Sequence, residues 1–292
     1  MTQLRQKMIR QMQLRDLSEN TQRGYLQAIT ALAKHYMLPP DQLSPKMLED
    51  YLLHLKNDLG RAPKTCGVFK AAFGFFYHDV LSNEEMKINF SIKRNTRKLP
   101  VVLSQDEVLR IINAPRNIKH RLLLMTTYSA GLRISEVVVL KPEHIDRNRM
   151  LIKIENGKGT KERYSLLSEM LLKELQVYYK SRRPKQWLFP AERTGVPIAT
   201  RTLYRIYEKA REKAGVKKGS GPHTLRHSFA THLLEAGYDI RKIQVLMGHK
   251  SLSATIIYLH VSQKTLSQIK SPLDLISTHP CERKEGENGP NN

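Results

Sequence analysis

The chain has 292 residues, 40% of them hydrophobic, which is enough for two ordinary domains or one large one. No run of about 18 apolar residues occurs, and the N-terminal MTQLRQKMIRQMQLRDL lacks a signal-peptide pattern, so we expect a cytoplasmic protein without a membrane span. Its two cysteines lie far apart in unlike contexts, which argues against a disulfide framework.

The net charge of +22 indicates a polyanionic partner. Residues 1–100 hold 16 Lys and Arg against nine Asp and Glu, and residues 101–292 hold 33 against 18. Positive charge spread over both parts suits a protein that grips nucleic acid with two domains, since each neutralised phosphate releases counterions. A basic ribosomal or membrane-surface protein remains an alternative.

Residues 1–92 show helical periodicity and little sign of strands. Ser18 and Ser44-Pro45 are helix-start signals, and a third helix is expected over 63–81. The apolar face of that third helix comprises Val68, Phe69, Ala72, Phe73, Phe76 and Tyr77. We interpret these aromatic side chains as core rather than as a platform for stacking bases.

A polar, basic connector over 93–101 follows, in which Lys93-Arg94-Asn95-Thr96-Arg97-Lys98 is either a solvated linker or a segment that touches phosphate. A second domain, 102–276, opens with a capping box from Ser104 to Glu107. One helix is expected to run from this capping box to about Asn113, and another to span 120–129. Further helices are expected to begin near Ser168, Thr200 and Thr224, and a last one to run through Tyr258. Strands are expected at 150–155 and 162–167 around a turn at 156–160. The polar residues 277–292 are expected to be disordered.

The stretch PHTLRHSFATHLLEAG, residues 222–237, predicts a helix that carries an arginine and three histidines whose roles need explaining. Leu225, Phe229, Leu233 and Leu234 recur at helical spacing and would face a core. His223 and Arg226 project together from the positive end of the helix, which favours phosphate binding. A zinc site of the HExxH type lacks its glutamate and a third ligand, so no metal is expected. His227 and His232 are interpreted as structural, surface or capping residues.

Arg133 in YSAGLRISEVVVL is a single charge among buried positions, at the start of a helix whose apolar face is Leu132, Ile134, Val137 and Val138. Burial of an arginine is costly without an anion. Either a bound phosphate or an ion pair with Glu136 would meet that need. Lys158, between two glycines in NGKGTKER, is either an ordinary basic turn residue or a lysine that reaches into a site from a hairpin tip. The phosphate-loop pattern GxxxxGK[ST] is absent.

The stretch MGHKSLSATIIYLHVS adds His249 and Tyr258. We expect a helix capped by Ser251, with a buried stripe made of Leu252, Ile256 and Leu259. Tyr258 has the small or polar neighbours Ala254, Thr255, Val261 and Ser262, so either its hydroxyl lies at a cleft or the side chain is a packing residue like most tyrosines of the chain.

Arg133, Lys158, His223-x-x-Arg226, Gly248-His249 and Tyr258 occur in one order, and with them the sequence resembles the tyrosine recombinases of the phage-integrase family. Compact Xer-type bacterial members are the most similar. The matching stretches are LSQDEV, GLRISE, GKGTKER, PHTLRHSFATHLLEAG and LMGHKSLSATIIYLHV, together with SENTQRGYL in the N-terminal part. A helical insertion found before the WLFP-like stretch in integron integrases is missing here, and Ala254 stands where relatives often have threonine.

The resemblance implies a site-specific recombinase in which Tyr258 attacks a DNA phosphorus and forms a 3′-phosphotyrosyl bond. Arg133, Arg226 and His249 would hold the phosphate oxygens, and Lys158 would protonate the leaving 5′ oxygen. His223 would assist proton transfer at the tyrosine, and Glu136 would orient a neighbouring side chain. Neither a metal nor another cofactor is implied, because the phosphotyrosine retains the energy of the broken bond.

The resemblance also implies a mainly α fold with a small β-hairpin or sheet, arranged as a two-domain C-shaped clamp on double-stranded DNA. Residues 1–92 would be the helical, SAM-like DNA-binding domain. A homotetramer would join two DNA sites through a Holliday junction, with Leu266–Ile276 packed on a neighbouring protomer or on its own domain. A paired recombinase or accessory protein is possible. The alternatives are a relaxase of the type IB topoisomerase kind and a DNA-binding protein that has lost its chemistry.

Overall fold

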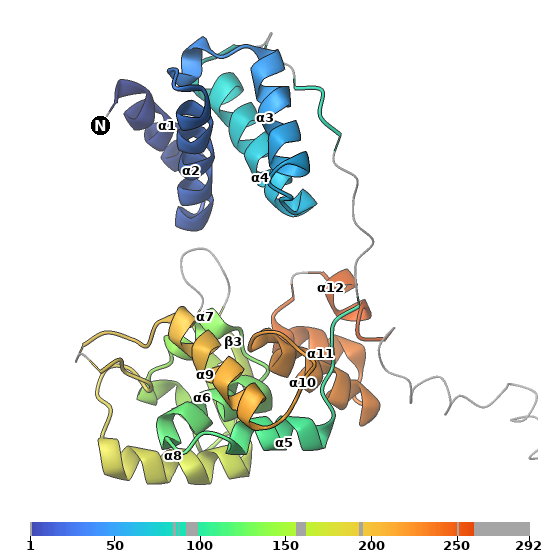
Figure 1. The fold of residues 1–292 in the computed structure, drawn as a ribbon. Helices are drawn as coiled ribbons and strands as arrows, with labels where there is room; N and C mark the ends of the chain where they lie inside the picture. Colours follow the sequence, from blue (N-terminus) through green and yellow to red (C-terminus); the bar gives the residue numbers. More distant parts are fainter. Residues whose placement is uncertain are drawn as a thin grey trace, which may run out of the picture. The chain divides into compact units, whose positions relative to one another are not determined.

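The computed structural model describes residues 2–83, 86, 88–91, 99–155, 162–192, 195–249 and 251–259. The chain divides into two compact units, residues 1–97 and 98–292, each with its own hydrophobic core (Figure 1). The predicted fold class, mainly α with a small sheet, is confirmed. In the described part of the chain, no helix is long and apolar enough to cross a bilayer.

The N-terminal unit is helical throughout its regular structure. Its elements are α1 (Gln3–Leu14), α2 (Glu19–Tyr36), η1 (Pro40–Gln42), α3 (Pro45–Asn57), α4 (Pro63–Gly74) and η2 (Phe75–Val80). The two start signals are confirmed, because Ser18 Oγ accepts from the Thr21 N–H at 3.3 Å and Ser44 Oγ accepts from the Met47 N–H at 3.3 Å. Such bonds satisfy N–H groups that have no partner inside the helix.

The helix expected over 63–81 forms as α4 followed by a π-helical turn, η2. Its aromatic side chains are core, as predicted: Phe73, Phe76 and Tyr77 are buried, whereas Val68 is exposed. α4 packs on α2 and α3, and η2 packs on α1. These rings therefore stabilise the unit by burying apolar area.

The C-terminal unit combines helices with a small sheet. They are α5 (Gln105–Asn113), α6 (Ile118–Ser129), α7 (Ile134–Val138), η3 (Pro142–His144), β1 (Ile145–Asp146), β2 (Leu151–Ile154), β3 (Arg163–Leu166), α8 (Glu169–Arg182), α9 (Thr200–Lys213), α10 (His223–Glu235), α11 (Ile240–Met247) and α12 (Ser253–Ile256). The capping box of α5 is present, with Ser104 and Glu107 each bonding the other's backbone N–H. The expected linker residues 93–98 lie outside the described residues.

A three-stranded antiparallel sheet has the order β1-β2-β3. The two predicted strands pair as expected, with Leu151 opposite Leu166 and Ile154 opposite Arg163, and the turn between them lies outside the described residues. β1 has only two residues, too few to show a periodic pattern in the sequence. Along β3 the residues alternate between buried and exposed positions, which turns Arg163 inward.

The last three helices pack next to one another in this unit: α11 contacts both α10 and α12, and α10 also packs on α6 (Figure 1). Leu225, Phe229 and Leu234 of α10 are buried and Leu233 is partly buried, as the helical spacing predicts. Gly131, just after α6, has φ +60°, and a Cβ there would lie 2.2 Å from the Phe229 ring. Glycine thus lets the end of α6 approach α10.

Candidate active site

Among the predicted cations that the structure describes, Arg226 is the most deeply buried, with 5% of its side chain exposed. Its guanidinium donates to the carbonyls of Gly131 and Met247, and its Nη2 lies 3.3 Å from His249 Nε2. The side chain therefore joins the end of α6, the end of α11 and the loop that follows it. Burial and the charge of Arg133 lower the pKa of Arg226 to about 10, so it remains a cation at neutral pH.

Glu136 is the anion of the site and is 6% exposed. Arg163 Nη1 and Nη2 donate to its two oxygens at 2.8 Å each, Arg133 Nη1 donates to Oε1 at 2.8 Å, and the Arg133 N–H donates to Oε2 at 2.7 Å. Arg226 Nη1 is 3.9 Å away. Burial would raise the pKa of Glu136, but the hydrogen bonds from Arg163 and Arg133 lower it below its usual value. The ion pair of Arg133 and Glu136 considered from the sequence is therefore present, within a larger cluster.

The carboxyl end of α11 gathers three arginines. Its last carbonyls have no partner within the helix, and those of Gln244 and Val245 are met by backbone N–H groups of the residues that follow. The next carbonyls accept from arginine side chains: Leu246 from Arg163 at 3.2 Å, Met247 from Arg226, and Gly248 from Arg133 at 2.8 Å. The partial negative charge of a helix C-terminus and the Glu136 carboxylate offset repulsion among these cations.

His249 lies over this arginine cluster. Its Nδ1 is 2.9 Å from Thr255 Oγ1, a fully buried hydroxyl, and its Nε2 faces Arg226. Burial, Arg226 and Arg133 lower the pKa of His249 to about 4, so the ring is neutral at neutral pH. Thr255 thus fixes the orientation of the His249 ring, and His249 Nε2 is directed toward the cations.

Tyr258 corrects two expectations from the sequence. The helix expected to contain it, α12, ends at Ile256, and Tyr258 follows in a turn with its N–H bonded to the Thr255 carbonyl at 3.0 Å. The predicted buried stripe is wrong: Ile256 and Leu259 are 37% and 38% exposed, whereas Tyr258 is 2% exposed. Its ring stacks near His249, with centroids 6.4 Å apart and an interplanar angle of 12°.

The environment of Tyr258 combines burial with cations. Burial raises the pKa of the hydroxyl, and Arg226 and Arg133 act in the opposite direction. A neutral phenol is therefore the resting form, with two guanidinium groups in electrostatic range. Such an arrangement suits a nucleophile that loses its proton only as it attacks an anionic phosphate.

The three histidines of α10 have different surroundings. His223 is exposed at the first helical position, and desolvation, Arg226 and Arg133 lower its pKa. His227 Nδ1 is 3.0 Å from Tyr258 Oη, a contact that differs from the structural or surface role expected for this histidine. His232 is structural, as expected: its ring nitrogens lie 2.9 Å from Tyr128 Oη and 2.9 Å from the Leu103 carbonyl. Among the described residues, no cluster of three His, Cys, Asp or Glu could hold a metal ion.

The structure therefore brings together six of the seven residues singled out from the sequence: Arg133, Glu136, His223, Arg226, His249 and Tyr258. Lys158 lies outside the described residues. Arg163 is a further member that was not singled out from the sequence, although a strand over 162–167 places it on the same face as Ser165. Ser165 Oγ donates to the Ala130 carbonyl at 2.6 Å, next to the Gly131 carbonyl that Arg226 contacts.

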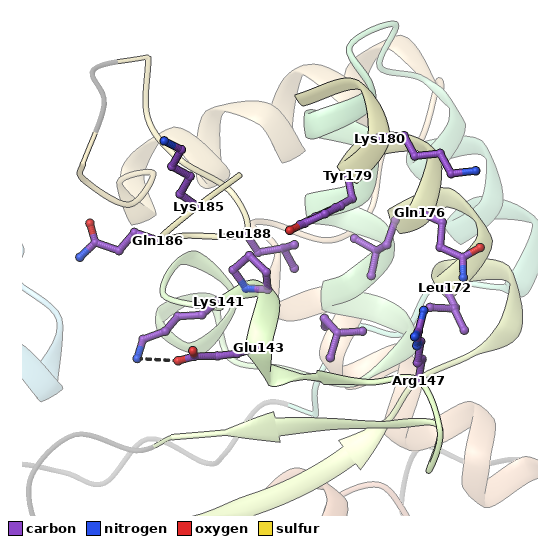
Figure 2. Close-up of a pocket in the computed structure, with 13 residues that line it drawn as sticks. Lys141, Glu143, Arg147, Leu172, Gln176, Tyr179, Lys180, Lys185, Gln186 and Leu188 are labelled. Carbon is purple, nitrogen blue, oxygen red and sulfur yellow. Dashed lines mark hydrogen bonds and ion pairs between the residues drawn. The ribbon is translucent and has the colours of Figure 1, made fainter. Parts of the chain in front are cut away.

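A cavity of about 930 Å³ lies elsewhere in this unit, between α8 and the segment around η3 and β1 (Figure 2). Lys141 and Glu143 form a 3.2 Å ion pair at its edge, and Leu172, Leu188 and the ring of Tyr179 supply apolar lining. None of the predicted site residues lines it, so it is separate from the arginine cluster.

Comparison with known proteins agrees with this geometry. The Phage integrase family model matches residues 101–265, and the model for the phage integrase N-terminal SAM-like domain matches residues 4–86. The chain belongs to the phage integrase family. A putative integrase/recombinase y4qK of Sinorhizobium fredii is 41% identical to this integrase over 277 residues, which cover 94% of this chain and 90% of that one.

Other relatives are tyrosine recombinases. Tyrosine recombinase XerA of Pyrococcus horikoshii is 36% identical over 214 residues, covering 72% of this chain and 74% of that one. The crystal structure of a XerA recombinase aligns with a TM-score of 0.54 at 27% identity, over 96% of this integrase and 99% of that chain. The Xer-type resemblance and the enzyme class are confirmed: the protein is a tyrosine-type, site-specific DNA recombinase.

Proposed function

We propose that this recombinase cuts one DNA strand with Tyr258 and holds the scissile phosphate with Arg133, Arg226 and His249. The observation that carries the proposal is the convergence of a buried tyrosine hydroxyl with two arginines fixed by the end of α11. Cleavage joins the tyrosine oxygen to the 3′ phosphate and releases a 5′ hydroxyl. Rejoining reverses the step and needs neither ATP nor a metal, since the phosphotyrosine keeps the bond energy.

The charges of the cluster suit the transition state. A phosphodiester under attack carries additional negative charge on its non-bridging oxygens, and fixed cationic donors stabilise that charge without reorganising. Glu136 and the α11 carbonyls fix the guanidinium groups before DNA arrives. Arg133 is 36% exposed, so part of its guanidinium is accessible to an incoming oxygen. Lys158 supplies the proton to the leaving oxygen, and the exposed His223 adds a donor at the amino end of α10.

The domain roles extend this proposal. Residues 1–92 bind DNA as a SAM-like helical domain, 93–101 are the basic linker, and 102–276 carry catalysis. The tail expected over 277–292 lies outside the described residues. Net charges of +7 for residues 1–100 and +15 for 101–292 support DNA contacts by both parts. The protein acts in the cytoplasm as a homotetramer on two double-stranded sites. Leu266–Ile276, which lies outside the described residues, joins neighbouring protomers.

A covalent-trapping assay tests the nucleophile. Wild type and Tyr258→Phe are incubated in EDTA with supercoiled plasmids carrying fragments of the source genome, quenched with detergent and scored for protein-linked DNA. We expect an adduct with wild type alone, and sequencing its ends defines the target. An adduct with Tyr258→Phe would assign the nucleophile elsewhere. No adduct with wild type, while both proteins bind the same DNA, would contradict cleavage by this chain alone.

Synapsis is tested separately with two copies of the mapped site on one plasmid. Deletion or inversion between the copies shows strand exchange, whereas relaxation of supercoils without rearranged products would point to a relaxase. Mass measurement of the Tyr258→Phe complex on the joined sites then gives the number of protomers.

A further inference from the structure

His227 makes a contact that the phosphate-binding residues leave unexplained. Its Nδ1 lies 3.0 Å from Tyr258 Oη, with the two rings 5.8 Å apart at 48°. Within the part of the chain that the structure describes, this is the hydroxyl's only hydrogen bond. No hydrogen bond joins His223 to Tyr258 there, although the resemblance to tyrosine recombinases implies proton transfer by His223.

The direction of the bond follows from the charge state of the ring. Burial lowers the pKa of His227 to about 4, with smaller contributions from His223 and the cationic Arg226, so the imidazole is neutral at neutral pH. A neutral imidazole offers one lone pair, and Nδ1 is the nitrogen that faces the hydroxyl. The phenol, which is neutral because burial raises its pKa, can therefore donate to Nδ1.

We propose that His227 is the general base that takes the proton from Tyr258 during DNA cleavage, an inference that rests on the proposed function. As Tyr258 Oη bonds to phosphorus, its O–H bond breaks and the proton moves to His227 Nδ1. The bond from phosphorus to the 5′ oxygen breaks at the same time, and the 5′ oxygen takes a proton from Lys158. In rejoining, the 5′ hydroxyl attacks phosphorus and returns its proton to Lys158, the bond from phosphorus to the tyrosine oxygen breaks, and protonated His227 returns its proton to the departing tyrosine.

The groups around His227 make this transfer responsive to DNA. Charged or titratable groups reach its ring from three elements: His223 and Arg226 on α10, Tyr258 after α12, and His249 after α11. In the free protein, the cations among them disfavour an imidazolium. A phosphate bound beside Arg226 adds negative charge, which offsets that effect and favours a protonated His227. The base therefore becomes stronger when a scissile phosphate is present.

The same helix provides a matched comparison. His232 Nδ1 lies 2.9 Å from Tyr128 Oη, with ring centroids 5.9 Å apart. Two histidines of α10 therefore each contact a tyrosine hydroxyl from another part of the chain. The His232 ring also contacts the Leu103 carbonyl at 2.9 Å, whereas the pKa of Tyr128 is raised by burial with no contribution from the arginines. A hydrogen bond between histidine and tyrosine is thus not sufficient for the proposed role. The neighbouring arginine cluster sets His227 apart.

The first test needs no DNA. In full-length protein labelled with ¹⁵N-histidine, Tyr258→Phe should shift the Nδ1 resonance of His227 and leave that of His232 in place, with Tyr128→Phe giving the reverse pattern. An unchanged His227 resonance in folded Tyr258→Phe would overturn the proposal, because the contact on which it depends would be missing in solution.

The second test measures single-turnover adduct formation on a nicked duplex containing the mapped site. His227→Gln should slow cleavage about 100-fold or more at unchanged DNA affinity, whereas His232→Gln should cleave at the wild-type rate per folded molecule. From about pH 7.5 to 9, above the range in which bound phosphate favours a protonated His227, the wild-type rate should stay flat and the His227→Gln rate should rise, because hydroxide must then remove the tyrosine proton.

Wild-type kinetics in His227→Gln, or an equally flat pH profile, would overturn the assignment. If the wild-type chain formed no adduct, that result would instead contradict the proposed function. The ¹⁵N measurement would still decide whether the contact between His227 and Tyr258 exists.

Discussion

Glu136 shows how one carboxylate organises several cations. It accepts from both guanidinium nitrogens of Arg163 and from the side chain and backbone of Arg133, and it is 6% exposed. Removing one partner from such a cluster leaves a buried charge without compensation. That loss destabilises the fold more than replacing the whole ion pair by apolar residues would. The site therefore depends on this carboxylate both for stability and for the position of Arg133.

Glu136→Gln is expected to lower the unfolding free energy by about 3 kcal/mol and to reduce adduct formation more than it reduces DNA binding. Glu174→Gln is the control, because Glu174 pairs with Arg121 where both side chains are about one-third exposed. There the loss should be about 0.5 kcal/mol, with wild-type cleavage. Urea denaturation and the trapping assay measure the two effects. Equal losses in the two variants would contradict a special role for the buried cluster.

At the scale of elements, helix starts were predictable because the capping side chain lies within three residues of the N–H that it bonds, as with Ser104 and Glu107. The end of α12 was not predictable. Leu252, Ile256 and Leu259 have helical spacing, but bonds made to other elements decide which face is buried: Thr255 contacts His249, and Tyr258 contacts His227.

The same reason explains which site residues the sequence revealed. Arg133, Arg226 and Tyr258 stand out within their own helical patterns as polar residues in unusual positions. The roles of Arg163 and His227 depend on partners 27 and 31 residues away in the chain. No local pattern specifies such distances, so only the packing of β3 and α10 against neighbouring elements shows these contacts.

The α11 C-terminus supplies a prediction at this scale. Gly248 caps the helix with φ +59°, and a Cβ there would lie 2.7 Å from Arg163 Cδ and Nε. Gly248→Ala should therefore cost about 3 kcal/mol, combining the left-handed backbone with overpacking, and should slow cleavage as Arg163 moves. Gly215→Ala, after α9, has φ +66° and open space around its Cβ, so only about 1 kcal/mol and no loss of cleavage are expected. Similar losses of stability and cleavage in both would contradict the contact with Arg163.

At the scale of the whole molecule, charge and protonation are linked. The net charge of +22 is spread over both units, so DNA binding should weaken as salt rises. DNA binding should also depend on pH. In the DNA-free protein, where Arg226 and Arg133 have no phosphate partner, the pKa values of His227 and His249 are about 4 and the pKa of His223 is lowered. Binding an anion favours the protonated form of each imidazole.

Specific DNA binding is therefore expected to take up protons near pH 6. The free imidazoles are neutral there, and the phosphate raises their pKa values, so the bound state holds more protons and affinity falls as pH rises from about 5.5 to 7.5. Calorimetry of Tyr258→Phe with the mapped duplex, in two buffers of different ionisation enthalpy at pH 6, measures the uptake without cleavage. His249→Gln in the same background should take up fewer protons. Tight binding with no uptake, or equal uptake after His249→Gln, would show that the phosphate does not lie beside these histidines.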